Sequence, residues 1–367
     1  MNTLKALLAL KPKKKLNGGY LISLAISVLA ALVLGGVVMA MTGHDPIEGY
    51  TALFQGAFGT PRAIGNTVAK SMTLCLLGLA TVIAAKAGIF NVGGEGQLFL
   101  GAMASAVLGS HLDGVSPWIG IPLCLLAAMA AGGAYAFIPG WLKVKLKVNE
   151  VITTIMLNSA AIFFCSYLAN GPLRTAERGI SAGTDSIPKV LMFPKLIRLS
   201  NLTESIFLAA LIALFVWYLL SRTSTGFEMK LTGQNERFAR YMGFKTERLA
   251  LGAMVASGAI CGLVGMFETF GLHGRFIQGV SVEFYFDGML VAMIMRYNPL
   301  GTILMSFFFG ALKIGATTME SRVGIPSELI LMVQSIIIFF MAAESGISEN
   351  LRNKRAQRKA MAQKGEA

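Results

Sequence analysis

Polar side chains interrupt an apolar stretch between residues 86 and 102, where Asn91, Glu95 and Gln97 stand among closely spaced glycines. Backbone groups freed from a helix in hydrocarbon are costly, so this segment is expected to be enclosed by protein or to line a polar cavity. Helix interruptions in membrane proteins often mark the place where a solute binds. These amide and carboxylate groups predict recognition of a polar solute by hydrogen bonds.

Further polar side chains lie within or beside apolar runs. Such groups are costly in a bilayer, so they tend to face a cavity or a partner. The predicted substrate pathway contains Asn91, Glu95, Gln97, Asn158, Glu268, Asp287 and Asn298. A second interpretation stays open, in which these residues cap helices or join neighbouring helices, with Glu268 and Asp287 near the outer interface. Lys70 is interpreted as a snorkelling residue.

The sequence has no pattern typical of an enzyme. The four cysteines are isolated in apolar segments, and the three histidines have no partner cluster. No Gly-x-x-x-x-Gly-Lys-Ser/Thr phosphate loop is present. We therefore expect no catalytic residues, no metal and no cofactor bound by this chain, and any ATP would be hydrolysed by a separate chain.

The composition predicts a membrane protein. Hydrophobic residues make up 54% of the 367 residues, charged residues only 14%, and the mean hydropathy is +0.64. Soluble domains carry about 25% charged residues. An all-α polytopic bundle of about ten spans, several of them short, is therefore expected. The expected spans are 20–41, 64–85, 98–108, 118–137, 151–169, 205–220, 249–271, 284–295, 302–315 and 325–343.

The net charge of +13 is concentrated in clusters beside the apolar runs. This is the positive-inside pattern of membrane proteins and is a poor fit to a nucleic-acid-binding face. It predicts basic cytoplasmic tails at 1–19 and 344–367, a transmembrane domain over 20–343 and a cytoplasmic loop over 221–248. The predicted outer segment 171–203 also carries basic residues, against the rule, but the other clusters outweigh it.

The loop over 221–248 contains a predicted short helix. Asn235 is a good N-cap, and Gly243 is placed where a glycine would end a helix over 236–242. Phe238 and Met242 would share one face of that helix. The pattern favours a docking segment for a cytoplasmic partner, and an interfacial helix on anionic lipid is the alternative.

Several motifs in this order resemble a known family. Residues 87–97 read Ala-Gly-Ile-Phe-Asn-Val-Gly-Gly-Glu-Gly-Gln, and 148–158 contain Val-Asn-Glu-Val-Ile and Thr-Ile-Met-Leu-Asn. Later matches are Thr225-Gly226, Gly233-Gln234-Asn235, Tyr241-Met242-Gly243, 271–276, Phe286-Asp287-Gly288 and Asn298-Pro299-Leu300-Gly301. Over about 71–342 the chain resembles permease subunits of bacterial nucleoside ABC importers, within the branched-chain amino acid and ribose permease superfamily. Lys70 and 295–297 depart from the expected pattern.

This resemblance implies an assembly in the bacterial plasma membrane. The chain would pair with a second related permease, two ATPase subunits and an extracytoplasmic nucleoside-binding lipoprotein, with ATP on the ATPases. The resemblance assigns coupling to the ATPases to Gly226, Gly233, Asn235, Arg237, Phe238, Arg240, Met242 and Gly243. Alternatives are a permease for a sugar such as ribose or galactose, a stand-alone ion-coupled transporter, and an assembly subunit without a pathway.

Overall fold

The computed structural model describes residues 18–176 and 183–326, together with 328, 329, 331, 332, 335, 336 and 339. The expected tails, apart from residues 18 and 19, lie outside this part of the chain. The described residues form two compact units, a larger one within 57–311 and a smaller one from parts of 14–56 and 312–367. Between residues 18 and 326 the regular elements are helices, and the described β pairing consists of isolated bridges, Gly183 with Ile277 and Lys195 with Thr203.

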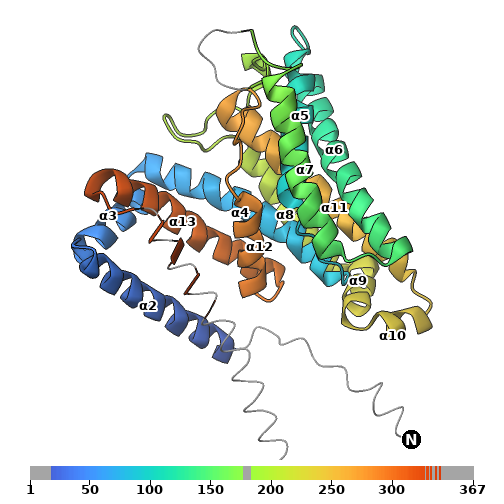
Figure 1. Ribbon diagram of the computed structural model, residues 1–367, viewed down its shortest axis with the longest axis horizontal. Coiled ribbons are helices and arrows are strands. Elements are labelled where there is room, and N and C mark those ends of the chain that lie inside the picture. The colour runs from blue at the N-terminus through green and yellow to red at the C-terminus, as the bar shows by residue number, and fades with distance from the viewer. Residues whose placement is uncertain are drawn as a thin grey trace, which may run out of the picture. The chain divides into compact units, whose positions relative to one another are not determined.

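The helices follow one another along the chain as drawn in Figure 1. They are α2 (Gly18–Met41), α3 (Pro46–Phe58), α4 (Pro61–Lys86), α5 (Gly94–Ser110), α6 (Pro117–Leu146), α7 (Glu150–Asn170), the short η1 (Lys189–Leu191), α8 (Ser205–Arg222), α9 (Ser224–Gln234), α10 (Glu236–Tyr241), α11 (Thr246–Glu268), the π-helical turn η2 (Thr269–His273), α12 (Phe284–Ile294) and α13 (Pro299–Val323). The all-α polytopic bundle is confirmed.

Seven helices in the described part of the chain are long and apolar enough to cross a membrane: α2, α4, α6, α7, α8, α11 with η2, and α13. The expected spans over 98–108 and 284–295 form α5 and the shorter apolar helix α12. The expected span over 325–343 lies mostly outside the described residues. The expected number of about ten spans is therefore not confirmed.

Two expected boundaries were wrong, and one helix was not expected. Helix α6 does not end at Phe137 but passes through Pro139 to Leu146. A proline is tolerated there because neighbouring groups in a membrane bundle can satisfy the freed carbonyl. Helix α13 continues beyond the expected 315 to Val323. Helix α3 was missed, since its thirteen residues are too few for a span.

Helix α11 is the centre of the larger unit and packs against α4, α5 and α6. Glycines make these contacts close. A Cβ atom at Gly101 of α5 would overlap the backbone of Gly262 of α11, and one at Gly132 of α6 would overlap the carbonyl of Gly258. Small residues at helix contacts let backbones approach closely in lipid.

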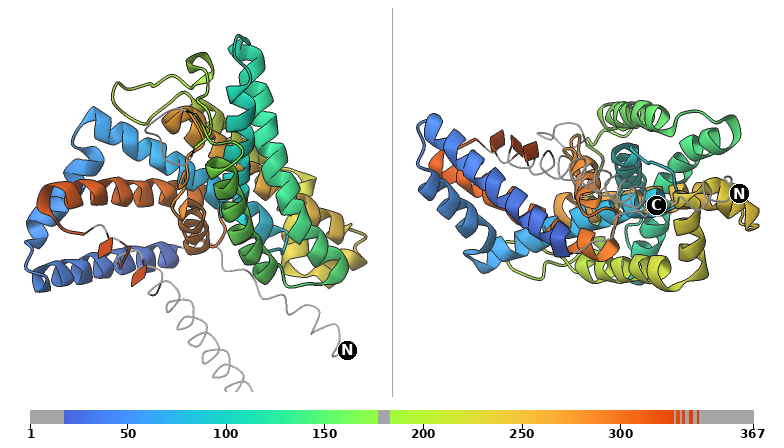
Figure 2. Two further views of the ribbon diagram at one scale, coloured as in Figure 1. Left: turned by 45° about the horizontal axis from the view of Figure 1, so that its top comes forward. Right: turned by 90° about the horizontal axis from the view of Figure 1, so that it is seen from below.

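The two ends of the larger unit differ in structure. Helices α9 and α10 lie together at one end of α6 and α11, whereas the long connection between α7 and α8 lies at the other end (Figures 1 and 2). In the smaller unit, the Tyr50 hydroxyl of α3 donates to the Leu32 carbonyl of α2. A Cβ atom at Gly56 of α3 would overlap Thr318 of α13.

Candidate functional site

The break between α4 and α5 organises the site. Helix α4 ends at Lys86, Gly88 follows with a φ of +82°, and α5 begins only at Gly94. Glu95 and Gln97 are therefore helical residues of the first turn of α5, and the break lies earlier than the glycine cluster had indicated. A left-handed φ favours glycine, so Gly88 allows the chain to turn away from α4.

Asn91 holds the non-helical segment to its surroundings. Its amide nitrogen donates to Gln97 Oε1 at 2.9 Å and to Ser257 Oγ of α11 at 3.0 Å. Its Oδ1 accepts the backbone N–H of Gly93 at 2.9 Å and the Gln97 side-chain amide at 3.2 Å. Asn91 and Gln97 are each 1% exposed, so both amides are satisfied inside the protein.

Glu95 joins α5 to the start of α12. One carboxylate oxygen accepts the Ser281 hydroxyl, and Oε2 accepts the backbone N–H of Tyr285 at 2.9 Å. The Tyr285 hydroxyl in turn donates to the Asn91 carbonyl, and Thr81 of α4 donates to that hydroxyl at 3.2 Å. Residues far apart in the chain thus form one buried polar network around the break, called here the break network.

Asn158 of α7 fixes the break from the other side. Its amide nitrogen donates to the Val92 carbonyl at 2.9 Å, and its Oδ1 accepts the N–H of Gly96 at 2.7 Å. Thr154 lies one turn earlier and accepts the N–H of Val92 at 3.3 Å. Four of the predicted pathway residues, Asn91, Glu95, Gln97 and Asn158, are therefore brought together at the break.

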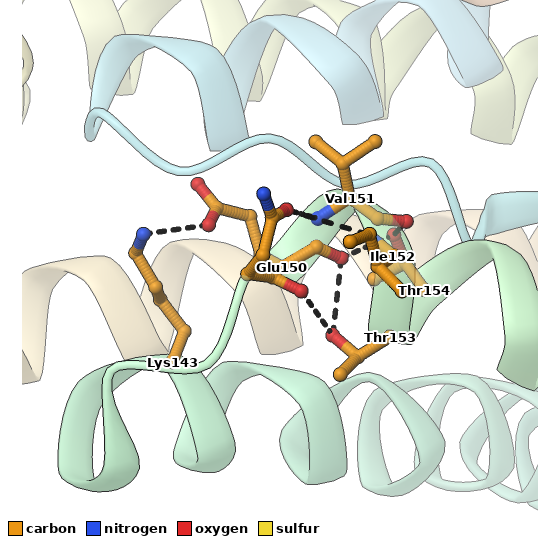
Figure 3. Close-up of polar contacts among 7 residues, drawn as sticks. Lys143, Glu150, Val151, Ile152, Thr153 and Thr154 are labelled. Atoms are coloured by element: carbon orange, nitrogen blue, oxygen red, sulfur yellow. Dashed lines mark hydrogen bonds and ion pairs between the residues drawn. The ribbon is translucent and has the colours of Figure 1, made fainter.

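The turn between α6 and α7 positions Asn158 and Thr154. Figure 3 shows Lys143 directed toward Glu150, with Nζ and Oε2 2.6 Å apart. The Asn149 side chain caps α7 by accepting the N–H of Val151 at 2.9 Å, and Thr154 Oγ1 donates to the Glu150 carbonyl at 2.6 Å (Figure 3). The cap starts α7 in the register that directs these polar side chains toward the break.

The other predicted pathway residues lie in different settings. Asp287 is buried in the first turn of α12, within electrostatic range of Glu95. Glu268, at the end of α11, accepts the Thr73 hydroxyl at 2.8 Å. Asn298 is a helix cap, because its Oδ1 accepts the N–H of Gly301 at 3.0 Å. Lys70 does not simply reach toward solvent, since its Nζ lies 2.9 Å from the centroid of the Phe284 ring.

The predicted coupling segment forms two helices, α9 and α10, rather than one. Asn235 caps α10 as expected, accepting the N–H of Phe238 at 3.0 Å, and Gly243 follows that helix with a φ of +84°. Arg237 and Met242 are exposed, and Arg240 pairs with Glu236 at 2.7 Å. Helix α10 ends at Tyr241, one residue before the expected end.

The predicted coupling segment, α9 and α10, touches the end of α4 directly. A Cβ atom at Gly233 would overlap the Lys86 carbonyl, and one at Gly88 would lie 3.0 Å from Cα of Gly233. Gly226 of α9 packs as closely, against the Leu219 carbonyl of α8. The segment therefore contacts the backbone that leads into the break network.

Residues 63–342 match the family model described as the branched-chain amino acid transport system / permease component. The chain belongs to this permease family. The apolar helices agree, and the permease is a multi-pass membrane protein. No solved structure matches it.

Three relatives of the permease cover most of its length. It is 34% identical to the guanosine ABC transporter permease protein NupP of Bacillus subtilis, over 88% of this chain and 93% of the relative. It is 32% identical to the nucleoside ABC transporter permease protein NupB of Lactococcus lactis, over 87% and 90%. It is also 32% identical to the glucose ABC transporter permease protein TsgB13 of Haloferax volcanii, over 86% and 85%. The first two organisms each contribute a second, more distant permease relative, NupQ at 24% and NupC at 23% identity.

The sequence interpretation missed several partners in the break network, namely Thr81, Ser257, Ser281 and Tyr285. It also missed Thr73, which donates to Glu268 outside this network. Serine and threonine are common in membrane helices, where they bond to their own backbone, so nothing local marks these. Tyr285 carried a signal. It stands beside Asp287 in an otherwise apolar run, and a buried tyrosine hydroxyl usually needs a partner.

Proposed function

We propose that this permease forms, with a second related permease, the membrane pathway of an ATP-binding cassette importer for nucleosides. The observation that carries the proposal is the similarity to NupP and NupB over almost the whole of each chain. The paired relatives from the same organisms support a second permease as the partner.

In this proposal the remaining parts of the importer are separate chains. Two ATPase subunits bind ATP on the side of α9 and α10, and an extracytoplasmic lipoprotein delivers the nucleoside to the opposite end. The permease itself binds no cofactor and catalyses no reaction. It lies in the bacterial plasma membrane with both termini in the cytoplasm, an orientation supported by its basic tails and the basic 221–248 loop.

The pathway is proposed to run beside the break network. Asn91, Glu95, Gln97 and Asn158 are buried and hydrogen-bonded to one another or to the backbone, so they hold the break in shape. Asp287, Glu268 and Asn298 extend the polar surface along α12, α11 and the start of α13. A broken helix with polar groups at membrane depth supports a solute pathway because lipid-facing helices do not tolerate it.

Coupling is proposed to pass through α9 and α10 to the end of α4. The contact of Gly233 with the Lys86 carbonyl supports this route, because a displacement of α9 would reach the 87–93 segment without intervening side chains. Arg237, Phe238, Arg240 and Met242 would provide the surface that meets an ATPase.

Substrate identity is tested by uptake of radiolabelled guanosine, uridine and ribose in cells lacking this chain and in cells that re-express it. We expect uptake of the nucleosides to depend on the chain and ribose uptake not to. If only ribose uptake depends on the chain, the substrate is a sugar rather than a nucleoside, an alternative that the similarity to TsgB13 supports. Uptake in proteoliposomes without an ATPase would overturn the ABC mechanism in favour of a stand-alone transporter.

Coupling is tested by charge reversal on α10. Arg237→Glu is the cleaner variant, because Arg240 is already paired with Glu236 and its reversal would also place two like charges together. We expect Arg237→Glu, and the double variant with Arg240→Glu, to lower substrate-dependent ATP hydrolysis without changing membrane insertion. Lys245→Glu, an exposed residue just before α11, is the matched control. Unchanged coupled hydrolysis in the double variant would refute the docking role.

A further inference from the structure

A cavity of about 920 Å³ lies between α10, the 87–89 segment, the end of α6 and the start of α11. None of the predicted pathway residues is among the described residues that line it. Its charged lining consists of Lys143, Lys147, Arg237, Arg240, Glu236 and Glu247. The cavity therefore has an excess of positive charge and is separate from the break network.

Two of the cations have partners and two do not. Lys143 pairs with Glu150 at 2.6 Å, and Arg240 pairs with Glu236 at 2.7 Å. Lys147 and Arg237 form no ion pair with any residue in the described part of the chain, and both line the cavity from different walls, the α6–α7 turn and α10. Two unpaired cations facing one space attract an anion.

Two further features of the cavity, one in its backbone and one in its lining, support a binding site. Lys147 has a φ of +57° at the end of α6, a left-handed position that favours glycine, yet a lysine occupies it. The buried Thr232 lines the cavity, and among the described residues its hydroxyl has no partner. The space exceeds a single phosphate group and has the size of a small-molecule site.

We propose that this cavity binds a phosphate-bearing anion, with Lys147 and Arg237 as the charges that hold the phosphate. The exposed ring of Tyr241 and the apolar Ile89 and Val144 line the same space and contact the group that carries the phosphate. Two sources share this chemistry, a free nucleotide and the headgroup of an anionic phospholipid. The proposal concerns a second ligand and is independent of which solute the permease transports.

Thermal unfolding of the purified full chain in detergent tests the proposal. The probes are ADP, phosphatidylglycerol and the zwitterionic phosphatidylcholine. A ligand that binds only the folded protein raises Tm, and the rise grows with the logarithm of the ligand concentration relative to its Kd. We expect ADP or phosphatidylglycerol to raise Tm and phosphatidylcholine to have little effect. A rise with ADP alone identifies a free phosphate compound, and a rise with phosphatidylglycerol alone identifies a lipid headgroup.

Charge-neutral variants connect any effect to this cavity. Lys147→Gln and Arg237→Gln should each weaken the apparent affinity about tenfold or more, and together they should abolish the Tm shift. Lys245→Gln removes an exposed positive charge that does not line the cavity and should keep the shift. If the double variant fails to fold, Arg237→Gln on the exposed face of α10 decides alone. The proposal is overturned if neither phosphate probe shifts Tm, or if Arg237→Gln leaves the apparent affinity unchanged, and the cavity is then left to an acidic side chain of a partner subunit.

Discussion

Glu95 Oε2 accepts the backbone N–H of Tyr285 at 2.9 Å, so a carboxylate in the first turn of α5 caps the first turn of α12. The arrangement differs from the usual one, in which the residue directly before a helix caps it. Here the residue before α12 is Glu283, with a φ of +57°, and its side chain forms no cap. One side chain therefore ties together two helices whose bonded residues are 190 positions apart in the sequence.

Replacement of Glu95 separates its structural role from its proposed role in transport. Glu95→Ala leaves the buried Ser281 hydroxyl and the Tyr285 N–H without an acceptor, and each unpaired group costs about 1–3 kcal/mol. Glu95→Gln keeps one acceptor oxygen and should lose less. We expect Tm of the purified chain to fall in the order wild type, Gln, Ala, and nucleoside uptake to fail in the Ala variant. Normal assembly with unchanged uptake in Glu95→Ala would refute the pathway role.

Removal of one hydroxyl tests the break network without removing charge. Tyr285→Phe deletes the donor to the Asn91 carbonyl and leaves Thr81 with one acceptor fewer. We expect a loss of about 1–2 kcal/mol in the free energy of unfolding. Tyr218→Phe on the exposed side of α8 is the control and should be neutral. Equal stabilities for the two variants would show that the Tyr285 hydroxyl contributes nothing.

Two glycines of α11 give opposite predictions for the same substitution. A Cβ atom at Gly262 would overlap the Ala128 carbonyl of α6, whereas nothing lies within 4 Å of one at Gly252. Gly262→Ala should therefore destabilise the protein by about 1–3 kcal/mol through overpacking. Gly252→Ala should be neutral or stabilise by up to about 1 kcal/mol, because alanine favours a helix. Thermal unfolding of both variants measures the difference, and a stable Gly262→Ala would mean that α6 and α11 can separate at no cost.

The Asn235 cap sets the stability of α10. Asn235→Ala leaves the N–H of Phe238 without its acceptor, at a cost of about 1 kcal/mol. That cost corresponds to roughly fivefold faster hydrogen–deuterium exchange over 236–241 by local opening. Asn235→Asp keeps a capping oxygen and should exchange as the wild type does. Unchanged exchange in the Ala variant would show that α10 is held by its neighbours instead.

Local chemistry made part of this structure predictable. Asn235 and Gly243 delimit α10 because capping depends on neighbouring residues, and the all-α bundle follows from composition. Helix α9 was missed because its apolar residues Phe227, Met229 and Leu231 are spaced two apart, which is not the spacing of a helical stripe, and contacts with α4, α8, α10 and α11 stabilise it. The same limit applies to α6, which continues past the expected end at Phe137 to Leu146 because it packs against α5 and α11.

The site was predictable in its residues but not in its pairings. The polar residues of the break stood out in the sequence, whereas Ser281 and Tyr285 lie almost 190 positions later. Which residue of α12 meets Glu95 depends on the relative register of α5 and α12. That register is set by the packing of α5 on α11 and of α12 on α4, and not by the local sequence pattern. Distant hydroxyl partners therefore appear only in three dimensions.

The glycine contacts among α5, α6 and α11 restrict how the permease can move. Where Gly101 meets Gly262 and Gly132 meets Gly258, backbone lies on backbone, so sliding one helix past another would drive side chains into main chain. We therefore expect these three helices to move together as one rigid body in any conformational change. We expect any bending to occur instead at the non-helical 87–93 segment, with α12 held to α5 by the hydrogen bond from the Tyr285 N–H to Glu95.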